Sequence, residues 1–151
     1  MASEQISLDE KVRLRIAELG RIAPGSVGDM LSFRLIGYDA DRRDILMTCE
    51  TMSWMRNSAG TLHGGMCAAI LDQAMGFVAH CLMTGEGTAP AVQLQVDYHR
   101  PLHPEERITV RVHVVSVTKS LIRLSAEAFQ TSDMERICLS GSGTYFQKQR
   151  L

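Results

Sequence analysis

The 151-residue sequence predicts an α+β domain in which one antiparallel sheet packs against helices on one of its faces. Three observations support this prediction. One long apolar segment, 62–84, has helical length and composition, and segments with hydrophobic residues at every second position lie on both sides of it. Short turns join consecutive strands, which favours antiparallel pairing. Because no linker or repeat interrupts the chain, we expect a single domain over residues 1–151 with its core at about 30–147.

The first predicted element is a helix at about residues 7–19. Ser7 and Glu10 have the spacing of a capping box, in which two side chains satisfy free backbone donors at a helix start. Hydrophobic residues then recur at helical spacing until Gly20, where we expect the helix to end. The segment APGSVG, 23–28, has the composition of a loop.

Six strands are predicted from the period of two. The segments 30–38 and 43–51 form a hairpin around the turn DADRR, and the loop 52–60 leads into the long helix, Leu62 to about Thr84. The segment GEGTAP ends that helix. Four further strands are expected at 92–98, 108–114, 121–130 and 137–147.

The composition argues against several classes of function. The formal net charge is −1, and no basic cluster indicates a nucleic-acid partner. The apolar stretch around residues 66–83 contains Asp72, Gln73 and His80, so it is a poor membrane span. The N-terminal MASEQISLDEK lacks the hydrophobic region of a signal peptide, and a cytoplasmic location is therefore expected.

The cysteines lie in apolar surroundings without the paired spacing of metal ligands or redox motifs. We therefore expect buried, reduced thiols and no bound metal. The four residues are Cys49, Cys67, Cys81 and Cys138.

The segment TLHGGMCAAILDQAMG, 61–76, opens the long helix with two glycines. Backbone N–H groups in the first turn of a helix have no partner within the helix, and the helix dipole adds partial positive charge there. At Gly64 and Gly65 no side chain covers these donors, so this end of the helix suits a carbonyl oxygen that becomes an oxyanion. The alternative is that the glycines only allow the helix start to pack closely against the sheet.

Asp72 is the one carboxylate in this apolar helix, and no Lys or Arg lies three or four residues away to neutralise it. A charge in such a setting requires a partner. Asp72 is therefore a candidate general base or nucleophile. The alternative is a structural carboxylate that is hydrogen-bonded to the sheet.

The spacing of these two groups predicts an assembly. Asp72 follows Gly64 by eight residues, which is about 12 Å along one helix. A nucleophile and an oxyanion donor must both lie about 3 Å from the same reacting group. One helix cannot supply both, so we expect a dimer in which two antiparallel helices form two composite sites across a two-fold axis.

Taken together, these motifs resemble those of hotdog-fold acyl-CoA thioesterases of the PaaI (phenylacetic acid) type. Asn57, then GTLHGG at 60–65, then Asp72 match the family's pattern, and VDYHRPL at 96–102 and SGSGTYF at 140–146 resemble two of its strands. The resemblance covers about residues 31–146. It implies a hotdog fold, an antiparallel sheet wrapped around one long central helix, with an extra N-terminal helix in this chain.

The resemblance also implies roles for the site residues. The Gly64 N–H would polarise the thioester carbonyl, Asp72 of the opposing subunit would be the nucleophile or the base for a water, and Asn57 would help to position the thioester or that water. Coenzyme A would be part of the substrate, with no other cofactor and no metal. The protein would be a homodimer, and we expect a dimer of dimers. The candidate substrate-binding residues are His63, Gly65, Met66, Arg100, Lys119 and Ser120.

One position departs from the family pattern. Some members carry Ser or Thr near the start of the strand after the central helix, and Ala91 stands there in this chain. Thr88 or Gln93 are the possible substitutes. A non-catalytic acyl-CoA-binding module of the same fold is therefore the alternative function. A hotdog dehydratase or hydratase ranks last. Such chemistry would want a His–carboxylate pair in the site, and the local context TLHGG does not resemble the dehydratase motif.

Overall fold

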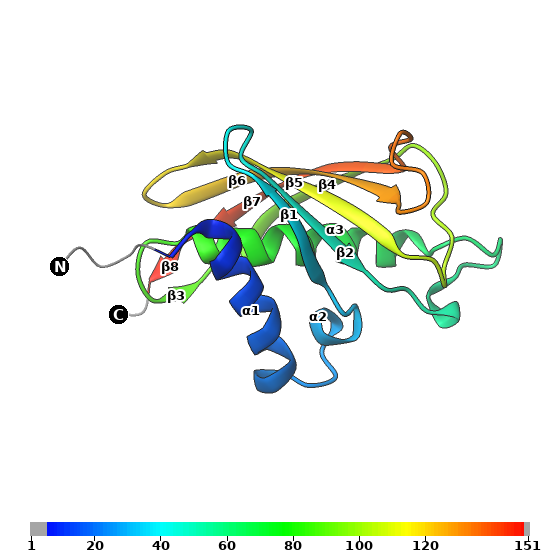
Figure 1. Ribbon diagram of the computed structural model, residues 1–151, viewed down its shortest axis with the longest axis horizontal. Helices are drawn as coiled ribbons and strands as arrows, with labels where there is room; N and C mark the ends of the chain where they lie inside the picture. Colours follow the sequence, from blue (N-terminus) through cyan, green and yellow to red (C-terminus); the bar gives the residue numbers. More distant parts are fainter. Residues whose placement is uncertain (1–5, 150–151) are drawn as a thin grey trace.

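The alternating segments of the sequence join one antiparallel sheet in the order β1-β2-β5-β6-β7-β4 (Figure 1). The computed structural model describes residues 6–149, so the outer ends of the predicted domain, 1–5 and 150–151, lie outside the described residues. The edge strand β4 is the first strand of this sheet after the long helix in sequence but lies at the far side of the sheet from β1. The strands are β1 (Arg34–Asp39), β2 (Asp44–Cys49), β4 (Ala91–Tyr98), β5 (Ile108–Val117), β6 (Leu121–Gln130) and β7 (Leu139–Phe146).

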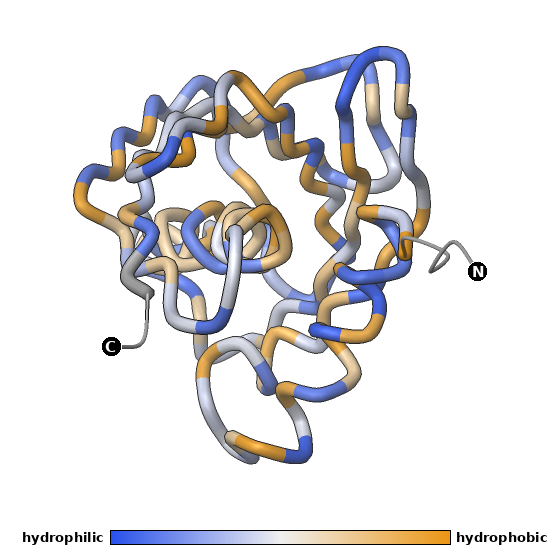
Figure 2. The backbone as a smooth tube through the Cα atoms, turned by 90° about the vertical axis from the view of Figure 1, so that its left-hand side faces the viewer, coloured by the Kyte–Doolittle hydropathy of each residue, from blue (hydrophilic) through white to orange (hydrophobic). Residues whose placement is uncertain are grey.

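The remaining elements lie around this sheet. The helices are α1 (Leu8–Ile22), α2 (Val27–Met30) and α3 (Gly64–Leu82), and one 3₁₀ turn, η1 (Ser53–Met55), precedes α3. Two short strands, β3 (Gly87–Thr88) and β8 (Lys148–Gln149), pair with each other. Figure 2 shows α3 nearly end-on, with the sheet curved around it.

The core forms between α3 and the concave face of the sheet. Full burial of each large aliphatic or aromatic side chain contributes about 1.5–3 kcal/mol, so this interface is the main source of stability. By length and composition, α3 is the one helix in the described part of the chain that is apolar enough to span a membrane, yet it packs against β6, β5, β7 and β4. Its buried residues are Cys67, Ile70, Leu71, Ala74, Met75, Phe77, Val78 and Ala79.

The structure confirms the predicted fold class and corrects several boundaries. Helix α1 continues past Gly20 to Ile22, and the Ala23 N–H still donates to the Leu19 carbonyl at 2.9 Å, so the helical hydrogen bonding tolerates the cost of about 1 kcal/mol for a helical glycine. Ser7 is the N-cap residue, but its side chain makes no capping hydrogen bond, so the predicted capping box was wrong. Helix α3 begins at Gly64 rather than Leu62, because the Leu62 N–H donates to the carbonyl of Leu102.

The loop expected at 23–28 contains the start of a short helix, α2, that the sequence pattern did not predict. Its N-cap Ser26 accepts a hydrogen bond from the Asp29 N–H at 3.4 Å. Four residues are too few to show a helical period, whereas the capping interaction is enough to stabilise one turn. Because Met30 ends this helix, the first strand begins at Arg34 instead of residue 30.

Two glycines on β7 allow α3 to lie close to the sheet. A Cβ atom at Gly141 would be 2.5 Å from the backbone oxygen of Gln95 and 3.0 Å from Leu71 Cδ1. At Gly143, a Cβ would be 2.7 Å from Tyr145 Cε2 and 3.2 Å from Met75 Cε. Both positions therefore require the absence of a side chain, and the SGSGTYF motif is in part a packing requirement.

We expect Gly141→Ala to lower the free energy of unfolding by roughly 1–3 kcal/mol, the usual cost of overpacking. The added methyl group meets a backbone oxygen, which cannot rotate away. Urea unfolding followed by circular dichroism measures this change. Gly37→Ala in β1 is the matched control, because its Cβ would lie 3.8 Å from the nearest neighbour. Equal unfolding midpoints for the two variants would contradict the prediction.

Candidate functional site

The N-terminus of α3 leaves one backbone donor available. The N–H of Gly65 donates to Nδ1 of His63 at 2.9 Å, and the N–H of Met66 donates to the His63 carbonyl at 2.9 Å. Within residues 6–149, no acceptor contacts the Gly64 N–H. The partial positive charge of the helix end is therefore presented mainly through Gly64.

His63 is the residue that arranges this helix end. It is the N-cap of α3, and its own N–H donates to the carbonyl of Met55 at 2.8 Å. Because Nδ1 accepts a hydrogen bond, the neutral ring carries its proton on Nε2. Gly65 and Met66 were predicted substrate-binding residues. The Gly65 N–H is occupied by the cap, and the Met66 side chain packs on the core.

A cleft of about 320 Å³ opens beside this helix end. Its lining brings together Asn57, Gly64 and Arg100, three of the predicted site residues from separate parts of the chain. Arg100 donates from Nη1 to the carbonyl of Ile137 at 2.9 Å, which holds its guanidinium at the rim. The cleft is therefore open, has a free N–H at its wall and carries a cation at its edge.

Asn57 organises the loop in front of α3. Its Oδ1 accepts from the N–H groups of Ala59 and Thr61 at 2.9 and 3.2 Å, and its Nδ2 donates to Thr61 Oγ1 at 2.9 Å. These bonds form a turn of the kind that Asn stabilises. One amide hydrogen on Nδ2 is left for a ligand, so Asn57 shapes the cleft and retains one donor.

Tyr98 is a cleft residue that the sequence did not single out. Its hydroxyl donates to the carbonyl of Gly64 at 2.8 Å, although its side chain is largely exposed. A Cβ at Gly64 would lie 3.5–3.7 Å from the Tyr98 ring and hydroxyl, so the ring lies in van der Waals contact with the glycine. The VDYHRPL motif thus supplies one wall of the cleft.

Asp72 lies outside this cleft, two helical turns further along α3. It is half-buried, and its carboxylate Oδ1 accepts a hydrogen bond from the Tyr145 hydroxyl at 3.0 Å. The same hydroxyl lies 3.2 Å from the Asp72 carbonyl oxygen. Burial, together with the nearby Asp72 charge, raises the pKa of the Tyr145 phenol, which therefore stays protonated and acts as the donor.

Lys119 and Ser120 are not near the cleft of the same chain. They lie in the turn between β5 and β6, where Leu121 is paired with Phe146 in the sheet register. Tyr98 is paired with Leu139 at the opposite end of β7. Within one chain, Lys119 and Ser120 therefore lie at the opposite end of the sheet from Arg100.

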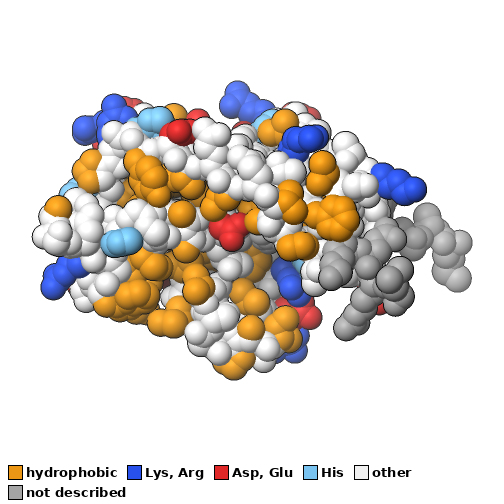
Figure 3. Space-filling model, turned by 180° about the vertical axis from the view of Figure 1, so that it is seen from behind, with side chains coloured by type: hydrophobic (Ala, Val, Ile, Leu, Met, Phe, Trp, Pro, Cys, Tyr) orange, Lys and Arg blue, Asp and Glu red, His pale blue; other side chains and the backbone are white. Residues whose placement is uncertain are grey.

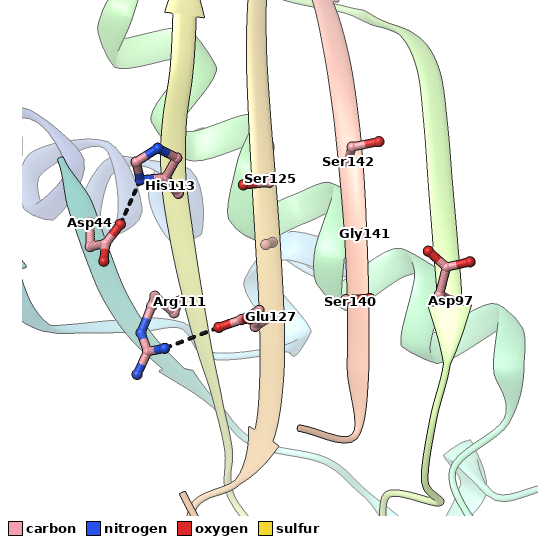
Figure 4. Close-up of a pocket in the computed structure, with 10 residues that line it drawn as sticks. Asp44, Asp97, Arg111, His113, Ser125, Glu127, Ser140, Gly141 and Ser142 are labelled. Atoms are coloured by element: carbon pink, nitrogen blue, oxygen red, sulfur yellow. Dashed lines mark hydrogen bonds and ion pairs between the residues drawn. The ribbon is translucent and has the colours of Figure 1, made fainter. Parts of the chain in front are cut away.

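A larger cleft, about 460 Å³, lies on the outer face of the sheet (Figure 4). There His113 Nδ1 pairs with Asp44 Oδ1 at 2.8 Å, and Ser125 is the register partner of His113. This Asp–His–Ser row lies in the middle of the sheet, where backbone N–H groups bond to neighbouring strands and none is left for an oxyanion. The cleft at the start of α3 is therefore a better candidate site for acyl transfer than the cleft on the outer face.

Cys67 also lines the α3 cleft and is a possible nucleophile by position alone. Burial raises the pKa of its thiol to about 11. The pKa of Cys81 is also raised to about 11 and that of Cys49 to about 12, in both cases chiefly by burial. Because the thiolate is the reactive form, these cysteines are inert near neutral pH. No group of metal-ligating side chains occurs among the described residues.

We expect Cys67 to resist iodoacetamide at pH 8 in the folded protein and to react readily after unfolding in urea. A raised pKa means that the thiolate becomes abundant only as the pH approaches about 11. Peptide mapping by mass spectrometry after timed alkylation measures this, with the unfolded protein as the reference. Fast alkylation of Cys67 at pH 8 without unfolding would contradict the raised pKa.

Comparison with known proteins places these features in a family. The thioesterase superfamily model matches residues 59–137, which is more than half of the chain and includes Gly64 and Asp72. No curated protein matches the sequence significantly.

Solved structures share the fold at low sequence identity. E. coli PaaI from the phenylacetic acid degradation operon has a TM-score of 0.76 at 17% identity, covering 94% of this chain and 96% of that one. Thioesterase superfamily member 2 from Mus musculus has a TM-score of 0.73 at 17% identity, covering 95% and 100%. A Streptococcus mutans protein bound to acetyl CoA has a TM-score of 0.65 at 16% identity, covering 78% and 91%.

The predicted resemblance is thus confirmed for family and fold, since the six-stranded antiparallel sheet around α3 is the hotdog architecture. The chain belongs to the thioesterase superfamily and is a thioester hydrolase with a hotdog fold.

Proposed function

We propose that this protein hydrolyses an acyl- or aroyl-CoA thioester to the free acid and CoA. The observation that carries the proposal is the unoccupied Gly64 N–H at the start of α3, at the wall of an open cleft. An oxyanion donor of this kind is what acyl transfer needs. The family membership and the acetyl CoA bound to the S. mutans relative support CoA as the leaving group.

In the proposed reaction, the thioester oxygen accepts a hydrogen bond from the Gly64 N–H, and Asp72 of the opposing subunit acts on the carbonyl carbon. In direct attack, a carboxylate oxygen bonds to that carbon, the C–S bond breaks, and water then hydrolyses the acyl–Asp72 anhydride. In base catalysis, Asp72 takes a proton from the attacking water and returns it to the departing thiolate. Both routes use the same two groups.

A dimer is proposed because α3 separates its two reacting groups by about 12 Å. Strand β4 is an edge strand that is exposed along almost its whole length, and such edges pair readily with another chain. Exposed apolar side chains on it include Val92 and Leu94, and Figure 3 shows hydrophobic side chains gathered on the face that this edge presents. Joining two chains there would bring α3 helices alongside each other and form two composite sites.

Arg100, Lys119 and Ser120 remain the proposed contacts for the CoA arm. The dimer supports this set, because antiparallel subunits place opposite ends of the two sheets near each other. Arg100 of one chain and Lys119 of the other would then flank one site. The cation at the rim suits the phosphate groups of CoA. The alternative of a non-catalytic binding module is favoured only by Ala91, which offers no hydroxyl at the start of β4.

We expect Asp72→Asn and Asp72→Ala to lower kcat for acyl-CoA hydrolysis by roughly 100-fold or more, because each variant lacks the proposed base or nucleophile. Release of CoA thiol from a panel of acyl- and aroyl-CoA substrates measures the rate. Asp41→Asn in the β1–β2 turn is the matched control, because Asp41 is exposed and remote from α3. Wild-type turnover in both Asp72 variants would overturn the proposed role of Asp72, whereas binding of acyl-CoA without turnover by the wild-type protein would favour the binding module.

Mixed dimers test the composite site. An Asn57→Ala subunit lacks the side chain that holds the turn in front of α3, and an Asp72→Ala subunit lacks the carboxylate. Each homodimer should therefore be nearly inactive. A mixed dimer contains one intact site, and we expect about half of the wild-type activity per dimer. Purification by two different tags and measurement of thiol release checks this. Mixed dimers that are verified by mass but stay inactive would argue against shared sites.

A further inference from the structure

We propose that Tyr145 is the positioning residue for the Asp72 carboxylate: its hydroxyl holds Oδ1 and leaves Oδ2 to face the reacting group. This inference rests on the proposed function, because it assigns a task to Asp72. The Tyr145 side chain is 2% exposed, so its hydroxyl lies in the core rather than in solvent. Among the described residues, the hydroxyl oxygen has its two hydrogen-bond contacts with Asp72, at 3.0 Å to Oδ1 and 3.2 Å to the carbonyl oxygen.

The hydroxyl is directed at Asp72 by the strand that carries it. Tyr145 belongs to β7, and Gly143, two residues earlier, lies on the same face of that strand. A Cβ at Gly143 would approach Tyr145 Cε2 to 2.7 Å and the hydroxyl oxygen to 3.2 Å. The ring therefore lies along the strand in the space that Gly143 leaves free, and this orientation brings the phenol to α3.

Tyr145 also supplies a hydroxyl where its neighbour has none. In the sheet register Ala91 on β4 is the Cα partner of Tyr145, and paired residues of antiparallel strands lie on the same face. The methyl group of Ala91 offers no hydrogen bond. Among the described residues, Tyr145 is the side chain recorded as a hydrogen-bond donor to Asp72.

A phenol suits this task better than a cation. It fixes the carboxylate by one directional bond, whereas Lys or Arg would also neutralise the charge that attacks a carbonyl or accepts a proton. Burial keeps the phenol protonated, so the donor is present throughout the working pH range. The bond to Oδ1 restrains the carboxylate, and among the described residues no hydrogen bond is made to Oδ2.

The decisive variant is Tyr145→Phe, which keeps the buried ring and removes only the hydroxyl. We expect kcat to fall roughly tenfold or more, because a reacting group that is displaced by about 1 Å can lose up to 100-fold in rate. KM should stay within about twofold, because Tyr145 does not line the cleft beside Gly64. Tyr38→Phe is the matched control, since Tyr38 lies on β1 and is remote from α3; we expect wild-type kinetics for it.

A second variant tests the orientation of the ring. Gly143→Ala keeps the hydroxyl but pushes the ring, so it should also lower kcat with little change in KM. Thermal unfolding and gel filtration of each variant report folding and assembly. A fully folded Tyr145→Phe enzyme with wild-type kcat would overturn the inference, as would a rise in KM that accounts for the whole loss of kcat/KM.

The outcomes distinguish this inference from the proposed function. If Asp72→Asn is inactive and Tyr145→Phe is fully active, the proposed chemistry stands and only the positioning role fails. If Asp72→Asn keeps wild-type turnover, the proposed function fails first. If Tyr145→Phe loses kcat in proportion to its loss of folded protein, the hydroxyl has a structural role only, and the positioning role is rejected.

Discussion

The close packing of α3 on the concave face of the sheet is the constraint on which the rest of the structure depends. The helix can lie this near because Gly141 and Gly143 on β7 carry no side chains at the contact. Two tyrosines on adjacent strands then reach it: Tyr98 on β4 binds the Gly64 carbonyl, and Tyr145 on β7 binds Asp72. The close packing that buries the core therefore also fixes the positions of Gly64 and Asp72 on α3.

In the proposed mechanism, the geometry of α3 makes assembly part of the chemistry. A rigid helix cannot bring residues eight positions apart to one carbonyl carbon. The solution available to this chain is a second copy, for which the exposed β4 edge and the apolar surface around it provide a docking face. In the proposed dimer, α3 would have two separate tasks: it stabilises the fold of each chain, and it would supply reacting groups to two different sites.

The sequence predicts the local parts of this site well and the long-range parts poorly. The opening of the helix is predictable to within two residues because the glycines and the apolar run are neighbours in the chain, although the predicted start, Leu62, precedes the observed start, Gly64. The isolation of Asp72 is predictable because ion-pair spacing in a helix is local. The contact of Tyr145 with Asp72 joins residues 73 positions apart, and a period of two places Tyr145 on a strand without saying which atom its hydroxyl meets. Helix α2 was missed because one turn has no period.

A thioester is the expected substrate because the proposed site has few catalytic groups. A thioester carbonyl is already activated, and a thiolate leaves without a strong general acid. Such a reaction asks for one oxyanion donor and one carboxylate, and the proposed composite site would combine the Gly64 N–H of one subunit with Asp72 of the other. The cysteine in the cleft cannot substitute for the carboxylate, because burial raises the pKa of Cys67 to about 11. With so few groups, their exact placement carries the rate, and a neutral phenol is the donor that can hold a carboxylate still without cancelling its charge.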